Sequence, residues 1–111
     1  MIKEKEINKL TDLIVKKYKP EKIILFGSFA YGKPHKYSDI DLLLIKKTKE
    51  KPVNRGVEFM VDLTSDPKLP NFFRNRSIEL LVYTPDEVSK YGHEDFFLRN
   101  ILKRGKILYS L

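Results

Sequence analysis

The 111-residue sequence contains no cysteine. This absence excludes disulfide bonds, and it excludes metal sites that are built on thiolates. A metal ion bound by this chain would therefore take oxygen or imidazole ligands. Proteins without disulfides are typical of reducing compartments, so we expect a cytoplasmic protein.

Long apolar runs are also missing. No stretch approaches the ~20 apolar residues that a membrane-spanning helix requires. The first six residues, Met-Ile-Lys-Glu-Lys-Glu, carry charges where a signal peptide needs its apolar segment. Repeats, linker-like stretches and low-complexity tails are absent as well. We therefore expect one domain over residues 1–111, without a membrane span.

Negative charge is the minority sign in this chain. Twenty-two Lys and Arg residues stand against fifteen Asp and Glu residues, which gives a net charge of +7. This excess favours a polyanionic partner, such as a nucleoside triphosphate, a nucleic acid or an acidic protein. A composition rich in Lys, Glu and Ile is also typical of heat-adapted proteins, so the charge alone does not choose the partner.

The pattern of apolar residues predicts alternating helices and strands. The expected helices cover residues 3–19, 28–31, 52–63, 85–92 and 94–104, and the expected strands cover residues 23–26, 39–45, 77–83 and 107–109. Thr84, Pro85 and Glu87 together form the sequence signature of a helix start with a capping box. This alternation predicts an α/β (α+β) fold, in which helices pack on a small mixed β-sheet.

Apolar residues in the second half of the chain predict which faces are buried. The expected inward faces are Val57, Met60 and Val61 in the helix over 52–63, and Phe97, Leu98 and Ile101 in the helix over 94–104. Residues 64–76 contain two prolines and are expected to be irregular. An exposed Phe72-Phe73 pair beside Arg74 and Arg76 would form a patch for a partner protein.

Gly27 and Ser28 follow the apolar run 23–26, where a buried strand is expected to end and a helical turn to begin. The first N–H groups of a helix can bind a phosphate, and glycine lets the phosphate approach the backbone closely. The pair is therefore a candidate phosphate-binding element, although Gly-Ser alone is common.

Asp39 and Asp41 open the apolar strand expected over 39–45. Side chains two residues apart in a strand point to the same face, so the two carboxylates lie together. Carboxylates this close repel one another unless a cation lies between them. Mg²⁺ takes oxygen ligands, commonly one or two carboxylates plus substrate phosphates. A solvated strand end is the alternative, but the strand is apolar and Gly-Ser lies upstream, which favours a metal site.

Taken together, Gly27-Ser28, Gly32 and Ser38-Asp39-Ile40-Asp41-Leu42 resemble the signature of the nucleotidyltransferase superfamily that includes DNA polymerase beta. More narrowly, the chain resembles the minimal nucleotidyltransferases (MNT) found in HEPN/MNT toxin–antitoxin pairs. The segments 78–87 and 97–109 are also similar to that group, so the resemblance covers essentially the whole chain.

The resemblance implies an enzyme that transfers a nucleoside monophosphate, AMP from ATP, to an acceptor hydroxyl and releases pyrophosphate. Asp39 and Asp41 would share two Mg²⁺ ions, and Gly27 and Ser28 would hold the phosphates. Ser38 would belong to the nucleotide-binding loop that enters the acidic strand. Two-metal sites of this kind stabilise both the attacking and the leaving oxygen.

The family has a third carboxylate near the attacking hydroxyl, usually an aspartate, and the matching residue here is Glu79. Its side chain is one methylene longer, and Mg²⁺ tolerates little change in ligand geometry. The resemblance therefore assigns Glu79 to the catalytic and metal-binding set. It leaves two outcomes open, an altered but active centre and a degenerate one.

The resemblance also implies a partner, a helical HEPN-type toxin whose tyrosine would be the acceptor, with this chain as the antitoxin. The alternative is a catalytically degenerate antitoxin that neutralises its partner by binding alone. A basic domain that binds nucleic acid is a third reading, disfavoured because paired acids repel phosphates when no metal is bound. The acceptor, the preferred base and the number of copies in the assembly are not fixed by the sequence.

Overall fold

The computed structural model describes residues 4–32 and 39–111, and the expected elements are present with ends that shift by one or two residues. The elements are α1 (Glu4–Tyr18), β1 (Lys22–Phe26), α2 (Ser28–Tyr31), β2 (Ile40–Ile45), α3 (Pro52–Thr64), the 3₁₀ turn η1 (Asn71–Phe73), β3 (Ile78–Tyr83), α4 (Pro85–Tyr91), α5 (Phe96–Arg104) and β4 (Lys106–Ser110). Of the helices in the described ranges, none is long and apolar enough to cross a membrane.

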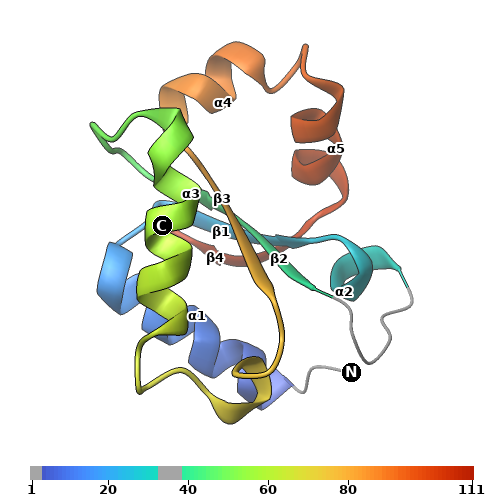
Figure 1. Ribbon diagram of the computed structural model, residues 1–111. Helices are drawn as coiled ribbons and strands as arrows, with labels where there is room; N and C mark the ends of the chain where they lie inside the picture. The colour runs from blue at the N-terminus through green and yellow to red at the C-terminus, as the bar shows by residue number, and fades with distance from the viewer. Residues whose placement is uncertain (1–3, 33–38) are drawn as a thin grey trace.

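The four strands form one mixed sheet in the order β3-β2-β1-β4 (Figure 1). β1 is antiparallel to both β2 and β4, whereas β2 and β3 are parallel. A parallel pair needs a crossover connection, and α3 with the following irregular segment provides it. The predicted α+β fold with a small mixed sheet is confirmed.

Helices cover both faces of the sheet. One face packs against α1, Leu63 of α3 and Phe73 of η1, and it forms the larger core. The other face is covered by α4 and α5, and its smaller core consists of Ile24, Phe26, Leu43, Ile45, Leu98 and Ile101. Figure 1 shows the same division, with α1 and α3 lying together and α4 and α5 forming a separate layer.

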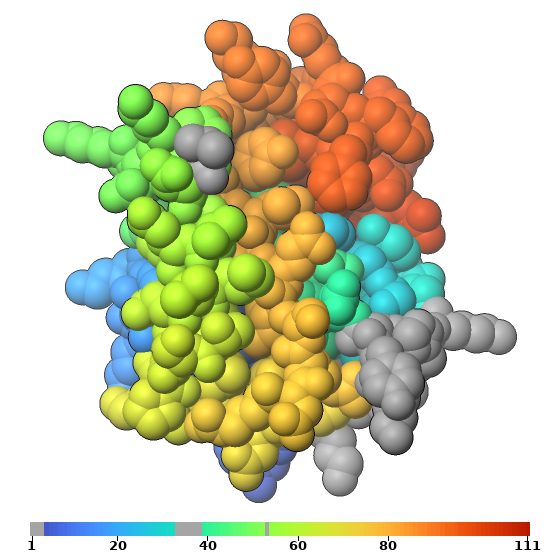
Figure 2. All heavy atoms as spheres, viewed as in Figure 1, coloured from blue at the N-terminus to red at the C-terminus, as the bar shows by residue number. Residues whose placement is uncertain are grey.

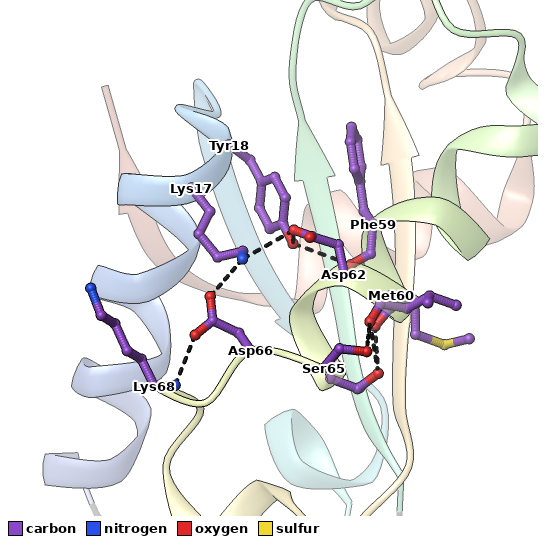
Figure 3. A network of polar contacts seen from close by, with 10 residues as sticks. Lys17, Tyr18, Phe59, Met60, Asp62, Ser65, Asp66 and Lys68 are labelled. Carbon is purple, nitrogen blue, oxygen red and sulfur yellow. Dashed lines mark hydrogen bonds and ion pairs between the residues drawn. The ribbon is translucent and has the colours of Figure 1, made fainter.

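A polar network joins the end of α1 to α3 (Figure 3). The Tyr18 hydroxyl donates to Asp62 at 2.7 Å, and the Lys17 ammonium lies 2.6 Å from Asp66 and 3.1 Å from Asp62. Lys17 lowers the pKa of Asp66, and the hydrogen bonds from Tyr18 and Lys17 lower the pKa of Asp62. These contacts fix the larger helical layer at the end of the sheet opposite the acidic strand start.

The prediction for the buried face of α3 is wrong in part. Val57 and Val61 are 60% and 55% exposed, whereas Gly56 and Leu63 face the sheet. A Cβ on Gly56 would lie 2.5 Å from the carbonyl oxygen of Leu80, so this glycine allows α3 to lie almost in contact with β3. Apolar residues occur all around α3, and the residue of α3 that lies closest to β3 is a glycine and not a large apolar side chain.

An ion pair between buried Arg55 and part-buried Glu87 joins α3 to the start of α4. Arg55 is 6% exposed, and its guanidinium contacts the Glu87 carboxylate and donates to the carbonyl oxygen of Glu50 at 2.8 Å. Glu87 also accepts from the backbone N–H of Thr84 at 2.8 Å, and the Thr84 hydroxyl accepts from the N–H of Glu87. The predicted capping box is confirmed, and its glutamate has a second role that the sequence did not indicate.

The prediction for α5 is correct for Leu98 and Ile101, each 1% exposed, and wrong for Phe97, which is 54% exposed. α5 begins at Phe96, two residues later than expected, and Asp95 caps it by accepting from the N–H of Leu98 at 3.0 Å. This start rotates Phe96 and Phe97 outward.

The Phe72-Phe73 pair is not exposed as a partner-binding patch would require. Phe73 is 1% exposed and belongs to the larger core. Phe72 is half-buried, with the Arg76 guanidinium 4.4 Å from its ring centroid. The 3₁₀ turn points Phe73 inward, which an irregular loop with no apolar periodicity does not reveal.

Candidate active site

Gly27 lies between β1 and α2 as the N-cap residue of α2, and both its backbone and its surroundings require glycine. Its φ is 77° and its ψ is −159°, a region that side chains make strained. A Cβ at this position would lie 2.1 Å from Oδ2 of Asp41. The Asp41 carboxylate is therefore in direct contact with the backbone at Gly27.

Asp41 occupies the second position of β2 and lies between two neighbours in the sheet. Its register partners are Phe26 on β1 and Glu79 on β3. Residues directly opposite one another in a sheet point to the same face, so these three side chains form a row. Ile24, Leu43 and Leu81 continue the same face into the smaller core. The row thus lies where that core ends and the sheet face opens.

The electrostatics of Asp41 show that the acids lie close together. Burial, and then the negative charges of Glu79 and Asp39, raise the pKa of Asp41 to about 6. Asp39 is exposed and directly precedes β2, whereas Glu79 is exposed on the edge strand β3. Repulsion between like charges is the state that a bound cation relieves.

The three acids suit a Mg²⁺ ion that also binds substrate oxygens. Within residues 4–32 and 39–111, no three His, Asp or Glu side chains are arranged as a metal-binding group by themselves. Mg²⁺ in phosphate-transfer sites is held by one or two carboxylates together with phosphates, so a complete cage of protein ligands is not required. The oxygen-only donor set and the charge repulsion at Asp41 both fit this ion.

Of the two serines assigned by resemblance, only Ser28 lies within the residues that the structure describes. Ser28 is the first residue of α2, directly after Gly27, and its side chain is half-buried. Ser38 lies outside the described residues, so its place in the nucleotide-binding loop stays a prediction. The carbonyl oxygen of Gly27 accepts from Ala30 at 3.0 Å, which closes the turn that directs the N-terminus of α2.

Aromatic residues and arginines that the sequence analysis did not assign surround this end of the sheet. Phe97 packs edge-on against Phe26, with ring centroids 6.0 Å apart. The Arg104 guanidinium lies 4.4 Å from the ring centroid of Tyr31, at the end of α2. Arg76 lies 5.7 Å from the ring centroid of Phe29. These pairs join segments far apart in the chain, so no local sequence signal could have found them.

The fold, and the acids that lie beside Gly27, are those expected of a protein that handles phosphate groups. Comparison with known families supports this class. The family model described as "Polymerase beta, Nucleotidyltransferase" matches residues 8–111. A relative from Methanocaldococcus jannaschii, named "Putative protein adenylyltransferase", is 30% identical over 98% of this chain and 100% of its own length.

A solved structure described as "Crystal structure of the toxin-antitoxin with AMP-PNP" has the same fold. It superposes with a TM-score of 0.63 over 95% of this chain and 73% of the other chain, at 22% identity. The chain thus belongs to the polymerase beta nucleotidyltransferase family. Nucleotidyl transfer is its class of enzymatic reaction.

Proposed function

We propose that this protein transfers AMP from ATP to a hydroxyl of a protein acceptor and that it acts as the antitoxin of a toxin–antitoxin pair. The observation that carries the proposal is the row formed by Asp41 and Glu79, in which the Asp41 carboxylate contacts Gly27, the residue before α2. The relative's adenylyltransferase name and the AMP-PNP of the structural neighbour support AMP as the transferred group.

The reaction forms a bond between the acceptor oxygen and the α-phosphorus of ATP, and it breaks the bond from that phosphorus to the bridging oxygen of pyrophosphate. Gly27 and Ser28 hold the β- and γ-phosphates through backbone N–H groups and the serine hydroxyl. Glu79 lies beside the acceptor hydroxyl and takes its proton as the new bond forms. Mg²⁺, held by Asp39, Asp41 and Glu79, would neutralise the charge that develops on the phosphate oxygens.

The toxin partner belongs to the same proposal. We infer a helical HEPN-type toxin whose tyrosine accepts AMP, because the chain resembles the minimal nucleotidyltransferases of HEPN/MNT pairs and its structural neighbour is described as a toxin-antitoxin. A neighbouring gene for a small helical protein with an Arg-x-x-x-x-His motif would support this assignment.

The experiment uses ATP labelled at the α-phosphate, Mg²⁺ and the co-expressed partner. We expect label on the partner and release of pyrophosphate, and no transfer of label from ATP labelled at the γ-phosphate. Asp41→Asn should abolish both transfer and Mg²⁺-dependent ATP binding. Unchanged nucleotide binding in the double variant Asp39→Asn/Asp41→Asn would contradict the assignment of the site.

A second candidate, a non-catalytic antitoxin, is favoured by the glutamate at position 79. Glu79→Asp and Glu79→Gln separate the two candidates. If Glu79 is catalytic, the aspartate variant keeps transfer activity and the glutamine variant loses it at least tenfold. If the protein acts by binding alone, both variants neutralise the toxin as well as the wild type does, and none of the three proteins transfers label.

A further inference from the structure

The C-terminal segment of the chain, residues 96–111, is a block of positive charge. It contains no Asp or Glu, and its four cations are Arg99, Lys103, Arg104 and Lys106. Within this segment, α5 covers the face of the sheet to which the side chains of Asp41 and Glu79 belong. Figure 2 shows α5, in red-orange, lying against α2, in cyan. The segment therefore brings positive charge to the face that carries the acids.

Phe97 and Arg104 lie on one side of α5, about two helical turns apart. Phe97 packs edge-on against Phe26, with ring centroids 6.0 Å apart, and Phe26 is the register partner of Asp41. At the other end of this side, the Arg104 guanidinium lies 4.4 Å from the ring centroid of Tyr31, the last residue of α2. This side of α5 therefore connects the strand beside the acids to the helix that follows Gly27.

Two contacts hold Arg104 close to Gly27. A Cβ on Gly105, the next residue, would lie 3.2 Å from the carbonyl oxygen of Leu25, so the end of α5 touches β1 two residues before Gly27. On the other side, the backbone N–H of Tyr31 donates to the carbonyl oxygen of Gly27 at 3.2 Å. Arg104 thus lies beside the turn that begins α2.

The other cations of this segment point elsewhere. Arg99 and Lys103 line a separate pocket of about 280 Å³ on the outer side of α5. Lys106 is the register partner of Leu25, which belongs to the larger core on the opposite face of the sheet. Within residues 4–32 and 39–111, Arg104 forms no ion pair with a carboxylate. Stacking on a ring leaves the N–H groups in the plane of the guanidinium available to an anion.

The order of these groups across the sheet indicates where the leaving group lies. Glu79 is on β3, Asp41 is on β2, Gly27 follows β1, and the end of α5 leads into β4 on the far side of β1. Nucleotidyl transfer requires the attacking and leaving oxygens to be roughly in line across the phosphorus. With the acceptor hydroxyl beside Glu79, the leaving oxygen faces Gly27 and Arg104. Glu79 takes the acceptor's proton, and pyrophosphate leaves with the electron pair of the broken P–O bond.

From these features we propose that Arg104, stacked on Tyr31, binds the terminal phosphates of the nucleotide and stabilises pyrophosphate as it leaves. The proposal rests on the proposed transfer reaction and adds a phosphate-binding residue from the C-terminal helix. A guanidinium binds phosphate oxygens through two parallel N–H groups, and the aromatic ring beneath it restricts its orientation. Arg104 would thus offset the charge that builds up on the leaving oxygen, on the side of the phosphorus away from the acids.

The test compares Arg104→Gln with Lys103→Gln by calorimetric titration with Mg·pyrophosphate and with AMP. Both residues are exposed in the last turn of α5, and each variant removes one positive charge. We expect Arg104→Gln to weaken Mg·pyrophosphate binding at least tenfold and to leave AMP binding within twofold of the wild type. Lys103→Gln should leave both values within twofold, and Arg104→Lys should retain part of the affinity because it keeps the charge without the planar fork. Equal losses in the two glutamine variants, or a parallel loss of AMP binding, would overturn the proposal.

A second readout needs no catalysis, so it separates this proposal from the transfer reaction itself. Mg·pyrophosphate added to the wild-type protein should shift the Nε–Hε NMR signal of Arg104, and AMP or sodium sulfate at the same concentration should cause at most a tenth of that shift. If the wild type transfers no AMP but the signal responds in this way, the role of Arg104 stands and the proposed reaction fails. If the signal does not move, or moves equally with sulfate, the role of Arg104 is wrong whether or not AMP is transferred.

Discussion

At the residue scale, the charge that the candidate site needs on Asp41 lowers the stability of the fold. Its pKa is raised to about 6, by burial first and then by Glu79 and Asp39. An acid whose pKa is higher in the folded state than in the unfolded state destabilises the fold once it ionises. The protein therefore gives up stability above the unfolded pKa of about 4 in order to keep this carboxylate charged.

Asp41→Asn should stabilise the metal-free protein at neutral pH. The shift is about two pKa units, and because Asp41 is partly exposed we discount it to about 1–2 kcal/mol. The folded state binds more protons than the unfolded state between about pH 4 and 6, so the wild type loses stability as the pH rises through that window. Urea unfolding in EDTA should show the gain at pH 7.5 and little gain at pH 4. A pH-independent difference would mean that the variant acts through packing.

Gly27→Ala should damage both folding and the site. The residue has a φ of 77°, and a Cβ would collide with Oδ2 of Asp41 at 2.1 Å. We expect a loss of about 1–3 kcal/mol in the free energy of unfolding and at least tenfold weaker Mg·ATP binding. Gly32→Ala is the comparison and should cost less, because the φ of Gly32 is −110° and its Cβ would lie 3.0 Å from its nearest neighbour, the Cα of Ser28. Chemical denaturation and calorimetric titration give both values, and equal losses in the two variants would refute the special role of Gly27.

At the scale of elements, the start of α4 depends on one carboxylate with two partners. Glu87 completes the capping box with Thr84 and neutralises the buried Arg55. Removing one member of a buried ion pair leaves an uncompensated charge, which is more costly than losing a cap. Both residues of this pair also line the pocket between α3 and β3.

Glu87→Ala should therefore destabilise the protein by about 3 kcal/mol, well above the ~1 kcal/mol of a lost cap. Asp86→Ala in the same helical turn is the matched control, since Asp86 is exposed and should cost at most about 0.5 kcal/mol. Arg55→Met in the Glu87→Ala background should recover part of the loss, because it removes the unpaired charge. Equal destabilisation by Glu87→Ala and Asp86→Ala in thermal melts would contradict the role of the ion pair.

The elements themselves could be predicted from the sequence, but the orientation of two helices could not. α1 has a single apolar stripe, and its Leu10 and Ile14 are fully buried. α3 has apolar residues on several sides, so periodicity could not show that Gly56 faces β3. The outward rotation of Phe97 depends on the cap at Asp95, one residue outside the apolar pattern.

Only part of the candidate site could be predicted from local sequence pattern. The i, i+2 spacing of Asp39 and Asp41 and their place at a strand start came from local pattern alone. The position of Glu79 opposite Asp41 depends on the parallel register of β2 and β3, which resemblance to a family could suggest but periodicity could not. The pocket between α3 and β3 depends on how the crossover through α3 lies against the sheet, and no motif in the sequence indicates this.

At the scale of the whole molecule, the site is built on the most protected element. β2 is the inner strand between β1 and β3, and Ile40, Leu42, Leu43 and Leu44 are fully buried. The layer formed by α4 and α5 contributes only Leu98 and Ile101 as fully buried side chains. Asp41 is therefore fixed by the core, whereas the helices that cover the open end of its sheet face are held by fewer contacts.

This difference predicts the order in which backbone amides exchange with solvent. Opening free energies follow local burial, so β1 and β2 should exchange last, at the rate of global unfolding, and α4 and α5 should exchange first. Native-state hydrogen exchange with NMR detection measures both groups. A non-hydrolysable Mg·ATP analogue at 100 times its Kd should stabilise the whole fold by about 2.7 kcal/mol and slow the β2 amides accordingly. If α4 and α5 already exchange with β2 in the free protein, the two layers unfold as one unit. In that case the smaller core is as strong as the larger one.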